Sequence, residues 1–179
     1  MKVSHKSLFA GFGGQGIISM GQIWVYLGMK EGKNVTFFPF YGAEKRGGIA
    51  RAGVIISDDE IASPLVTTPD SVVVMNIDSL SLCEEIVKEG GLMLINSSLV
   101  KDGPKRKDVN IVNIEASNLA EKAGHIRYAN MVALGALVKI TGFLKLADID
   151  SVLKGFFTED KHKFIPDNVE AIRAGMAAV

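Results

Sequence analysis

Residues 8–18 read LFAGFGGQGII, an apolar run that is broken by four glycines in six positions before it becomes apolar again. The segment that precedes the glycines, residues 7–10, is a short strand candidate. After the glycines, hydrophobic side chains recur at the spacing of one helix face, at Ile17, Met20, Ile23, Trp24 and Leu27. The run therefore predicts a buried strand, a tight glycine turn and a helix.

The rest of the chain alternates between strand-like and helix-like segments. β-branched or continuously apolar runs predict strands at residues 35–40, 50–57, 71–76, 92–98 and 110–114. Helical spacing predicts helices at residues 79–88, 116–123, 129–140, 148–157 and 168–176. The connection at residues 42–49 is too short for a helix, so the strands on either side of it should pair antiparallel.

This alternation predicts the fold class. We expect an α/β protein with three layers, in which helices cover both faces of a mixed, mostly parallel sheet. The opening β-α-β unit should be Rossmann-like, because a glycine turn joins its first strand to its helix. No linker or internal repeat interrupts the chain, so residues 1–179 should form a single domain.

Composition and charge exclude several classes of function. The 179 residues include 20 basic and 20 acidic side chains, so no net charge draws the chain to nucleic acid or to an anionic membrane. Residues 7–29 carry no charge, but glycines, Gln15 and Gln22 interrupt them and would leave backbone groups unsatisfied in lipid. We expect a soluble, cytoplasmic protein. A hydrophobic share of 47% is high for a free monomer and favours obligate protein partners.

Reactive and metal-binding side chains are few and scattered. Cys83 is the only cysteine, so this chain alone cannot build a disulfide, a thiolate zinc site or an iron–sulfur cluster, and we expect no metal site. His5, His125 and His162 lack the spacing of a metal site or a catalytic triad, and we expect each to be a surface or capping residue.

Two polar segments are expected to be structural or solvated. Ser97 and Ser98, at the end of a predicted strand, indicate a turn and a helix cap. Basic residues gather in one loop, at Lys101, Lys105, Arg106 and Lys107. Such a charge run is usually a solvated surface, and docking of an acidic ferredoxin is the alternative.

The glycine turn has the spacing of a phosphate-binding loop. Gly11, Gly13 and Gly16 satisfy G-x-G-x-x-G between a strand and a helix. Because glycines permit positive φ and remove Cβ atoms, free N–H groups at the helix start can face an anion, and Gln15 could add an amide contact. The alternative is that the glycines only permit a tight turn and close packing. A nicotinamide site would also need an acidic residue at the end of the second strand, which ends in aromatic residues instead.

A second group of polar residues follows the second strand, in the segment FYGAEKRGG at residues 40–48. Arg46 can hold a phosphate or carboxylate through its planar guanidinium, and Glu44 could orient it, beside Tyr41. The alternative is a solvated hairpin with a surface ion pair. A position near the carboxyl edge of the sheet favours a functional role.

Several motifs together resemble the gamma subunit of the 2-oxoacid:ferredoxin oxidoreductases. They are GFGGQGI at residues 11–17, YGAEKRGGIARAGVIISDDEIASP at 41–64 and PDSVVVMN at 69–76. Asn130 with the following LGALVKITG, and Asn168 ahead of Gly175, are similar to the C-terminal helices of that family. The family often has proline where this chain has Ala43, which affects the stiffness of the loop. The resemblance is closer to the 2-oxoglutarate or general oxoacid branches than to the pyruvate branch.

The resemblance implies one subunit of an enzyme complex that is not active alone. Such a complex converts a 2-oxoacid, coenzyme A (CoA) and oxidised ferredoxin into acyl-CoA, carbon dioxide and reduced ferredoxin. Thiamine diphosphate, Mg²⁺ and iron–sulfur clusters would lie in partner subunits, because this chain lacks a G-D-G motif and the cysteines of a cluster. The implied partners are the alpha and beta subunits, a ferredoxin-like delta subunit, and ferredoxin itself.

Within that family context we expect the glycine turn and the second polar group to face the phosphates of CoA. The candidate binding residues are Gly11, Gly13, Gly14, Gln15, Gly16, Tyr41, Glu44 and Arg46. Catalytic residues are not identified. Two other functions stay open from the residues alone: a self-sufficient oxidoreductase that binds NAD or a flavin, and a nucleotide-binding regulatory module.

Overall fold

The computed structural model describes residues 3–42, 48–146 and 148–179. Its centre is a six-stranded sheet with the order β2-β3-β1-β4-β5-β6. The strands are β1 (Ser4–Phe12), β2 (Asn34–Tyr41), β3 (Ile49–Ser57), β4 (Ser71–Val74), β5 (Leu92–Asn96) and β6 (Asn110–Ile114). β3 pairs antiparallel with both β1 and β2, whereas β1, β4, β5 and β6 pair parallel in turn. The predicted mixed, mostly parallel sheet is confirmed.

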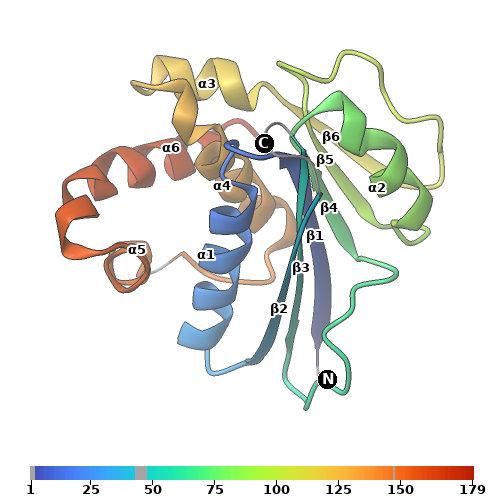
Figure 1. The fold of residues 1–179 in the computed structure, drawn as a ribbon, viewed down its shortest axis with the longest axis horizontal. Coiled ribbons are helices and arrows are strands. Elements are labelled where there is room, and N and C mark those ends of the chain that lie inside the picture. Colours follow the sequence, from blue (N-terminus) through green and yellow to red (C-terminus); the bar gives the residue numbers. More distant parts are fainter. Residues whose placement is uncertain (1–2, 43–47, 147) are drawn as a thin grey trace.

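Helices cover both faces of this sheet, as predicted. The elements are α1 (Ile17–Lys30), α2 (Leu80–Ile86), α3 (Ala116–Lys122), α4 (Ala129–Thr141), α5 (Ile149–Phe156), α6 (Ile165–Ala177) and the 3₁₀ turns η1 (Ile77–Ser79), η2 (Ile126–Tyr128) and η3 (Glu159–Phe164). Figure 1 shows α1, α4 and the other C-terminal helices on one side of the sheet and α2 on the other. Among the described residues, no helix is long and apolar enough to cross a membrane.

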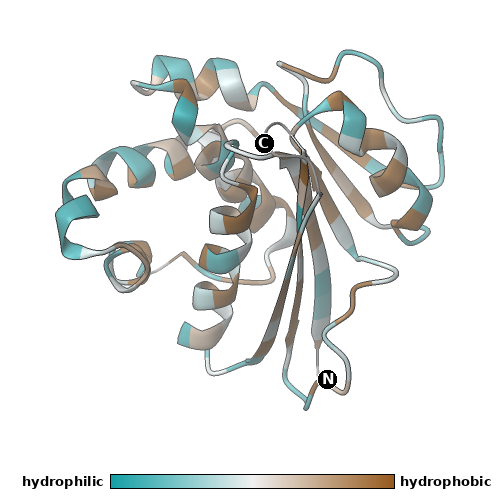
Figure 2. Cartoon of the chain, viewed as in Figure 1, coloured by the Kyte–Doolittle hydropathy of each residue, from teal (hydrophilic) through white to brown (hydrophobic). Residues whose placement is uncertain are grey.

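The larger core lies between the sheet and the helices α1, α4 and α6. Phe9 of β1 and Trp24 of α1 are fully buried there, and α4 is buried along most of its length. Hydropathy colouring in Figure 2 shows hydrophobic residues along the strands and hydrophilic residues on the outward turns of α3 and the start of α6. Such continuous apolar strands are typical of a sheet that is covered on both faces.

Two glycines allow α4 and α6 to pack closely. A Cβ atom on Gly135 of α4 would lie 2.0 Å from the carbonyl oxygen of Ile172, and one on Gly175 of α6 would lie 1.9 Å from that of Val132. Both distances are far below van der Waals contact, so only glycine fits at these positions. The crossing of these two helices fixes where the N-terminus of α4 meets the glycine turn.

The smaller core lies between α2 and the other face of β1, β4 and β5. Leu80 and Cys83 of α2 pack there with Leu8, Val72 and Met93. Burial raises the pKa of the Cys83 thiol to about 12, although the charge of Arg51 opposes this shift. Cys83 is therefore a core residue, as its position in the sequence predicted, and not a nucleophile.

Three departures from the sequence prediction concern the strand order and the starts of two helices. β3 lies between β1 and β2, so the strands of the first β-α-β unit run in the same direction without pairing. The helix expected at residues 79–88 begins as the 3₁₀ turn η1, because Asn76 Oδ1 accepts a hydrogen bond from Ser79 N at 3.2 Å. Helix α6 begins before residue 168, because Pro166 stands in its first turn, where proline needs no N–H partner.

Candidate functional site

The glycine turn lies at the carboxyl edge of the parallel strands, where β1 ends and α1 begins. Gly14 and Gly16 have positive φ, of 94° and 72°, a conformation that other residues rarely adopt. Gly16 stands at the N-cap of α1, and no described side chain caps this helix. The N–H groups of the first turn of α1 therefore have no side-chain acceptor among the described residues, and the helix dipole favours an anion in front of them.

Contacts within the chain hold the glycine turn in shape. Gln15 Oε1 accepts a hydrogen bond from Phe12 N at 2.7 Å, and Gln15 Nε2 donates one to the carbonyl oxygen of Met75 at 3.3 Å. Gly13 N donates to the carbonyl oxygen of Gly48 at 3.0 Å. Gln15 thus connects the end of β1 to the end of β4. Both polar atoms of its side-chain amide already have hydrogen-bond partners within the chain.

Asn130 is a residue of this site that the sequence prediction missed. It is buried at the start of α4, and its Nδ2 donates to the carbonyl oxygen of Gly16 at 3.2 Å. Its Oδ1 accepts from Met131 N at 3.0 Å. A Cβ atom on Gly16 would lie 2.3 Å from Asn130 Nδ2, so this contact also requires glycine. A polar side chain that opens an otherwise apolar helix was the available signal.

A cavity of about 310 Å³ opens beside the glycine turn. It is lined by the ends of several elements, at Gly14, Gln15, Met75, Leu99, Ser117, Ile126, Arg127 and Ala129. Ligand sites of open α/β sheets typically lie at this carboxyl edge. Leu99 and Ile126 are 47% and 53% exposed, which gives the cavity an apolar rim.

Arg127 supplies a cation to this cavity, and the sequence prediction missed it too. It is exposed on η2, with its guanidinium carbon 5.7 Å from the ring centroid of Tyr128 and 5.9 Å from that of Phe164. Within the described ranges no carboxylate pairs with it. Arg127 also lines a neighbouring cavity of about 180 Å³, which contains Ser19 of α1. Its charge is therefore available to a ligand at either cavity.

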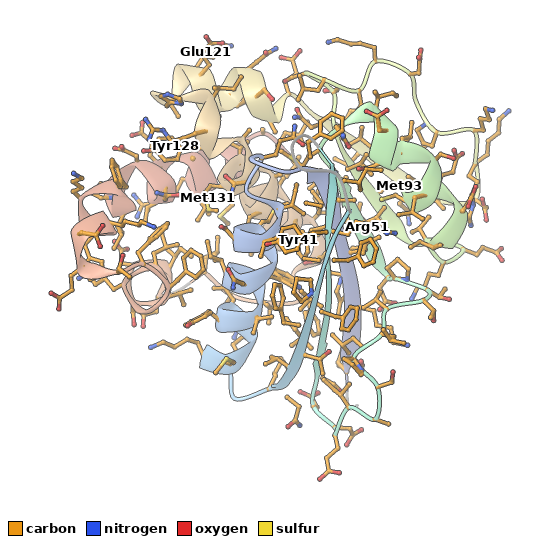
Figure 3. All side chains as sticks on the ribbon, viewed as in Figure 1. Tyr41, Arg51, Met93, Glu121, Tyr128 and Met131 are labelled. Carbon is orange, nitrogen blue, oxygen red and sulfur yellow. The ribbon has the colours of Figure 1, made fainter. Side chains whose placement is uncertain are left out.

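A hydrogen bond to Asp167 holds the Tyr128 side chain in place. The Tyr128 hydroxyl donates to Asp167 Oδ2 at 2.9 Å. Burial and this hydrogen bond raise the pKa of Tyr128, so the hydroxyl stays protonated at neutral pH. Figure 3 shows Tyr128 and Met131 on the face of the sheet that α1 and α4 cover.

The second polar group of the sequence prediction is described only in part. Tyr41 ends β2 and is 63% exposed, whereas Glu44 and Arg46 lie outside the described residues. On either side of that gap, Gly42 N donates to the carbonyl oxygen of Ile49 at 2.9 Å, and the Gly48 carbonyl accepts from Gly13 N. The β2–β3 connection is therefore attached directly to the glycine turn.

The remaining candidates have structural partners. His125 Nδ1 accepts from Arg127 N at 3.0 Å and caps η2, and Ser98 Oγ accepts from Asn118 N in the first turn of α3 at 3.2 Å, as predicted. The prediction for His5 is wrong, because this residue is half-buried, stacks on Phe143 and bonds Ser71 Oγ at 2.9 Å. Burial, which Phe143 provides in part, disfavours the charged ring.

Arg106 of the basic loop is also a structural residue and not simply solvated. Its Nη1 donates to the carbonyl oxygens of Glu84 at 3.0 Å and Val87 at 2.6 Å, and its Nε donates to Asp108 at 2.8 Å. These bonds hold the loop against the end of α2.

In the part of the chain that the structure covers, no three His, Cys, Asp or Glu side chains gather in a way that could hold a metal ion.

The sequence matches one protein family over almost its whole length. The family model is described as pyruvate ferredoxin/flavodoxin oxidoreductase, and it matches residues 6–178. The chain is 35% identical over 168 residues to the ketoisovalerate oxidoreductase subunit VorA of Methanothermobacter marburgensis. This match covers 93% of the chain and 34% of VorA, so the chain spans about a third of the length of that relative.

Two solved structures have a similar fold. The gamma subunit of keto/oxoacid ferredoxin oxidoreductase from Geobacter sulfurreducens matches with a TM-score of 0.83 and 28% identity, over 97% of both chains. The 2-oxoglutarate:ferredoxin oxidoreductase from Magnetococcus marinus, solved with 2-oxoglutarate, coenzyme A and succinyl-CoA bound, matches with a TM-score of 0.86 and 26% identity. That match covers 98% of this chain and 31% of the other.

Proposed function

The chain belongs to the pyruvate ferredoxin/flavodoxin oxidoreductase family, and from this premise we propose that it is the gamma subunit of a 2-oxoacid:ferredoxin oxidoreductase complex. The complex would convert a 2-oxoacid, CoA and oxidised ferredoxin into acyl-CoA, carbon dioxide and reduced ferredoxin. The match to a gamma subunit over 97% of both chains supports this role. In this role the whole chain acts as one gamma-type domain in the cytoplasm.

The chemistry of electron transfer and decarboxylation belongs to partner subunits in this proposal. The residues here do not suit the groups that such chemistry needs, because Cys83 is buried with a strongly raised pKa and is the only cysteine. We therefore assign thiamine diphosphate and Mg²⁺ to the alpha and beta subunits, and the iron–sulfur clusters to those subunits and a ferredoxin-like delta subunit. Ferredoxin would accept the electrons.

The contribution of this chain would be to hold CoA. One observation carries the assignment: the glycine turn that leads into the uncapped start of α1 lines one cavity together with Arg127, which has no described carboxylate partner, at the edge of the sheet where ligands bind. Phosphate groups suit this pair of features, and the apolar rim at Leu99 and Ile126 suits the uncharged arm of CoA. A bound CoA in the Magnetococcus marinus relative supports the ligand class.

Each candidate residue has a defined part in this proposal. Gly14 and Gly16 leave the backbone amides open, and Gly11 leaves room for the Gln15 side chain, whose Oε1 would lie 2.6 Å from a Cβ at that position. Gln15 and Gly13 hold the turn in shape through their own hydrogen bonds. Tyr41, Glu44 and Arg46 would approach the ligand from the β2–β3 connection.

Kinetics of the assembled complex test the CoA site. Arg127→Ala should raise the KM for CoA about ten- to hundredfold, because a charged hydrogen bond to phosphate is lost, while kcat and the KM for the oxoacid stay close to wild type. Arg46→Ala should act in the same direction. Arg173→Ala, which removes an exposed arginine of α6, is the matched control. Unchanged CoA affinity in both the Arg127→Ala and the Arg46→Ala complex would show that this chain does not contain the CoA site.

A further inference from the structure

One face of the β2–β3 hairpin has no helix over it among the described elements. α1 packs against the opposite face of these strands, and α2 lies beside β4. In the described part of the chain, the connection at residues 58–70 crosses the hairpin, where a Cβ on Gly53 would lie 3.2 Å from Val66 Cγ2. A shallow groove of about 170 Å³ is left between the hairpin and this connection.

Large apolar side chains line this groove and remain in contact with solvent. We call it the Arg51 groove, and its walls include Leu8, Phe38, Phe40, Arg51, Leu65 and Val66. Phe38, Phe40 and Leu65 are 43%, 47% and 54% exposed. Outward positions of an uncovered strand are usually polar, so clustered aromatic and aliphatic residues here indicate a surface that another molecule covers.

Arg51 adds an unmet electrostatic requirement to the same groove. Its guanidinium carbon lies 4.4 Å from the ring centroid of Phe40, and Figure 3 shows it on the α2 side of the sheet, across from Tyr41. Its Nε is buried, and no described residue accepts a hydrogen bond from it. No described carboxylate pairs with it. A buried charged donor without an acceptor is costly, so an acceptor placed on this Nε would be favourable.

We infer that the Arg51 groove is the docking site of another subunit of the complex, which places a carboxylate on Arg51 and an apolar side chain against Phe38, Phe40 and Leu65. This inference rests on the proposed function, because it needs a complex. Charge complementarity selects the occupant: of the described residues that line the groove, Arg51 is the only charged one. A free anion would satisfy Arg51 but leave the three apolar side chains in water, whereas a protein segment covers both.

Photo-crosslinking in the assembled complex tests the location. A photoreactive benzoylphenylalanine at Leu65 should crosslink to a partner subunit, at a segment that contains Asp or Glu. The same group at Met29, which is 56% exposed at the far end of α1, is the control and should give no crosslink to that segment. A complex that assembles and turns over without any partner crosslink from Leu65 would overturn the inference and leave the proposed function standing. A wild-type chain that never assembles would overturn both.

Removal of the charge with an unbranched side chain kept in place tests the role of Arg51. Arg51→Met keeps an unbranched stem on Phe40, so the isolated chain should unfold at the wild-type temperature or above, because an unsatisfied donor is gone. The same variant should weaken association with the partner subunits about tenfold, as expected when a charged hydrogen bond is lost. Arg173→Met is the matched control. A lower unfolding temperature with unchanged association would mean that Arg51 serves only the fold of this chain.

Discussion

At Gly16 two separate constraints coincide. Its φ is 72°, and a Cβ there would lie 2.3 Å from Asn130 Nδ2. Gly16→Ala should therefore lower the free energy of unfolding by about 2–4 kcal/mol, because strain and a steric clash add together. Gly14→Ala is the matched control, since φ is 94° but no atom of a described residue lies within 4 Å, and it should cost only about 1–2 kcal/mol. Urea unfolding of the isolated chain measures both, and equal losses would contradict the role of Asn130.

His5 should make the stability of the chain depend on pH. Burial lowers the pKa of His5 from its ordinary 6.5, while Asp70 opposes this shift and Lys88 adds to it. The unfolded chain therefore binds a proton more tightly than the folded chain, so the His5 contribution is complete above pH 6.5 and is lost as the pH falls toward the lower folded value. Free energies of unfolding across this range should fall less steeply for His5→Gln. An identical slope in both proteins would show that His5 does not titrate on unfolding.

The close packing of helices α4 and α6 predicts how substitutions of their glycines change the stability of the chain. Gly135→Ala should lower the free energy of unfolding by about 3 kcal/mol or more, because its new methyl group would press on the Ile172 carbonyl and force the helices apart. Gly155→Ala in α5 is the control, since the nearest atom to its Cβ is Tyr26 Cε1 at 3.8 Å. That variant should stabilise the chain by about 0.5–1 kcal/mol, as alanine does in a helix. Thermal unfolding compares them, and a stabilised Gly135→Ala would contradict the close crossing.

Most elements could be predicted because their signals are local. The glycine turn between β1 and α1 follows from residues 8–18 alone, and the antiparallel β2–β3 pair follows from the length of one connection. The position of β3 between β1 and β2 could not be predicted, because strand order depends on packing between distant segments. The same holds for the early end of β4 at Val74, since the polar cap that Asn76 gives to η1 competes with the strand.

At the scale of the whole molecule, the site combines both halves of the chain. The glycine turn was predictable from its spacing, whereas Asn130 and Arg127 lie more than a hundred residues further along and approach it only because α4 packs on the same face of the sheet as α1. No spacing rule connects such residues. The family, in contrast, followed from several motifs taken together, and the match over residues 6–178 confirms it.

Reconstitution with and without this chain tests the central claim most directly. Purified alpha, beta and delta subunits should reduce ferredoxin with a 2-oxoacid and CoA only after this chain is added, and this chain alone should have no activity. The added activity should saturate with CoA, and an Arg127→Ala chain should need a higher CoA concentration to reach the same rate. Full CoA-dependent ferredoxin reduction by the other subunits in the absence of this chain would contradict the account.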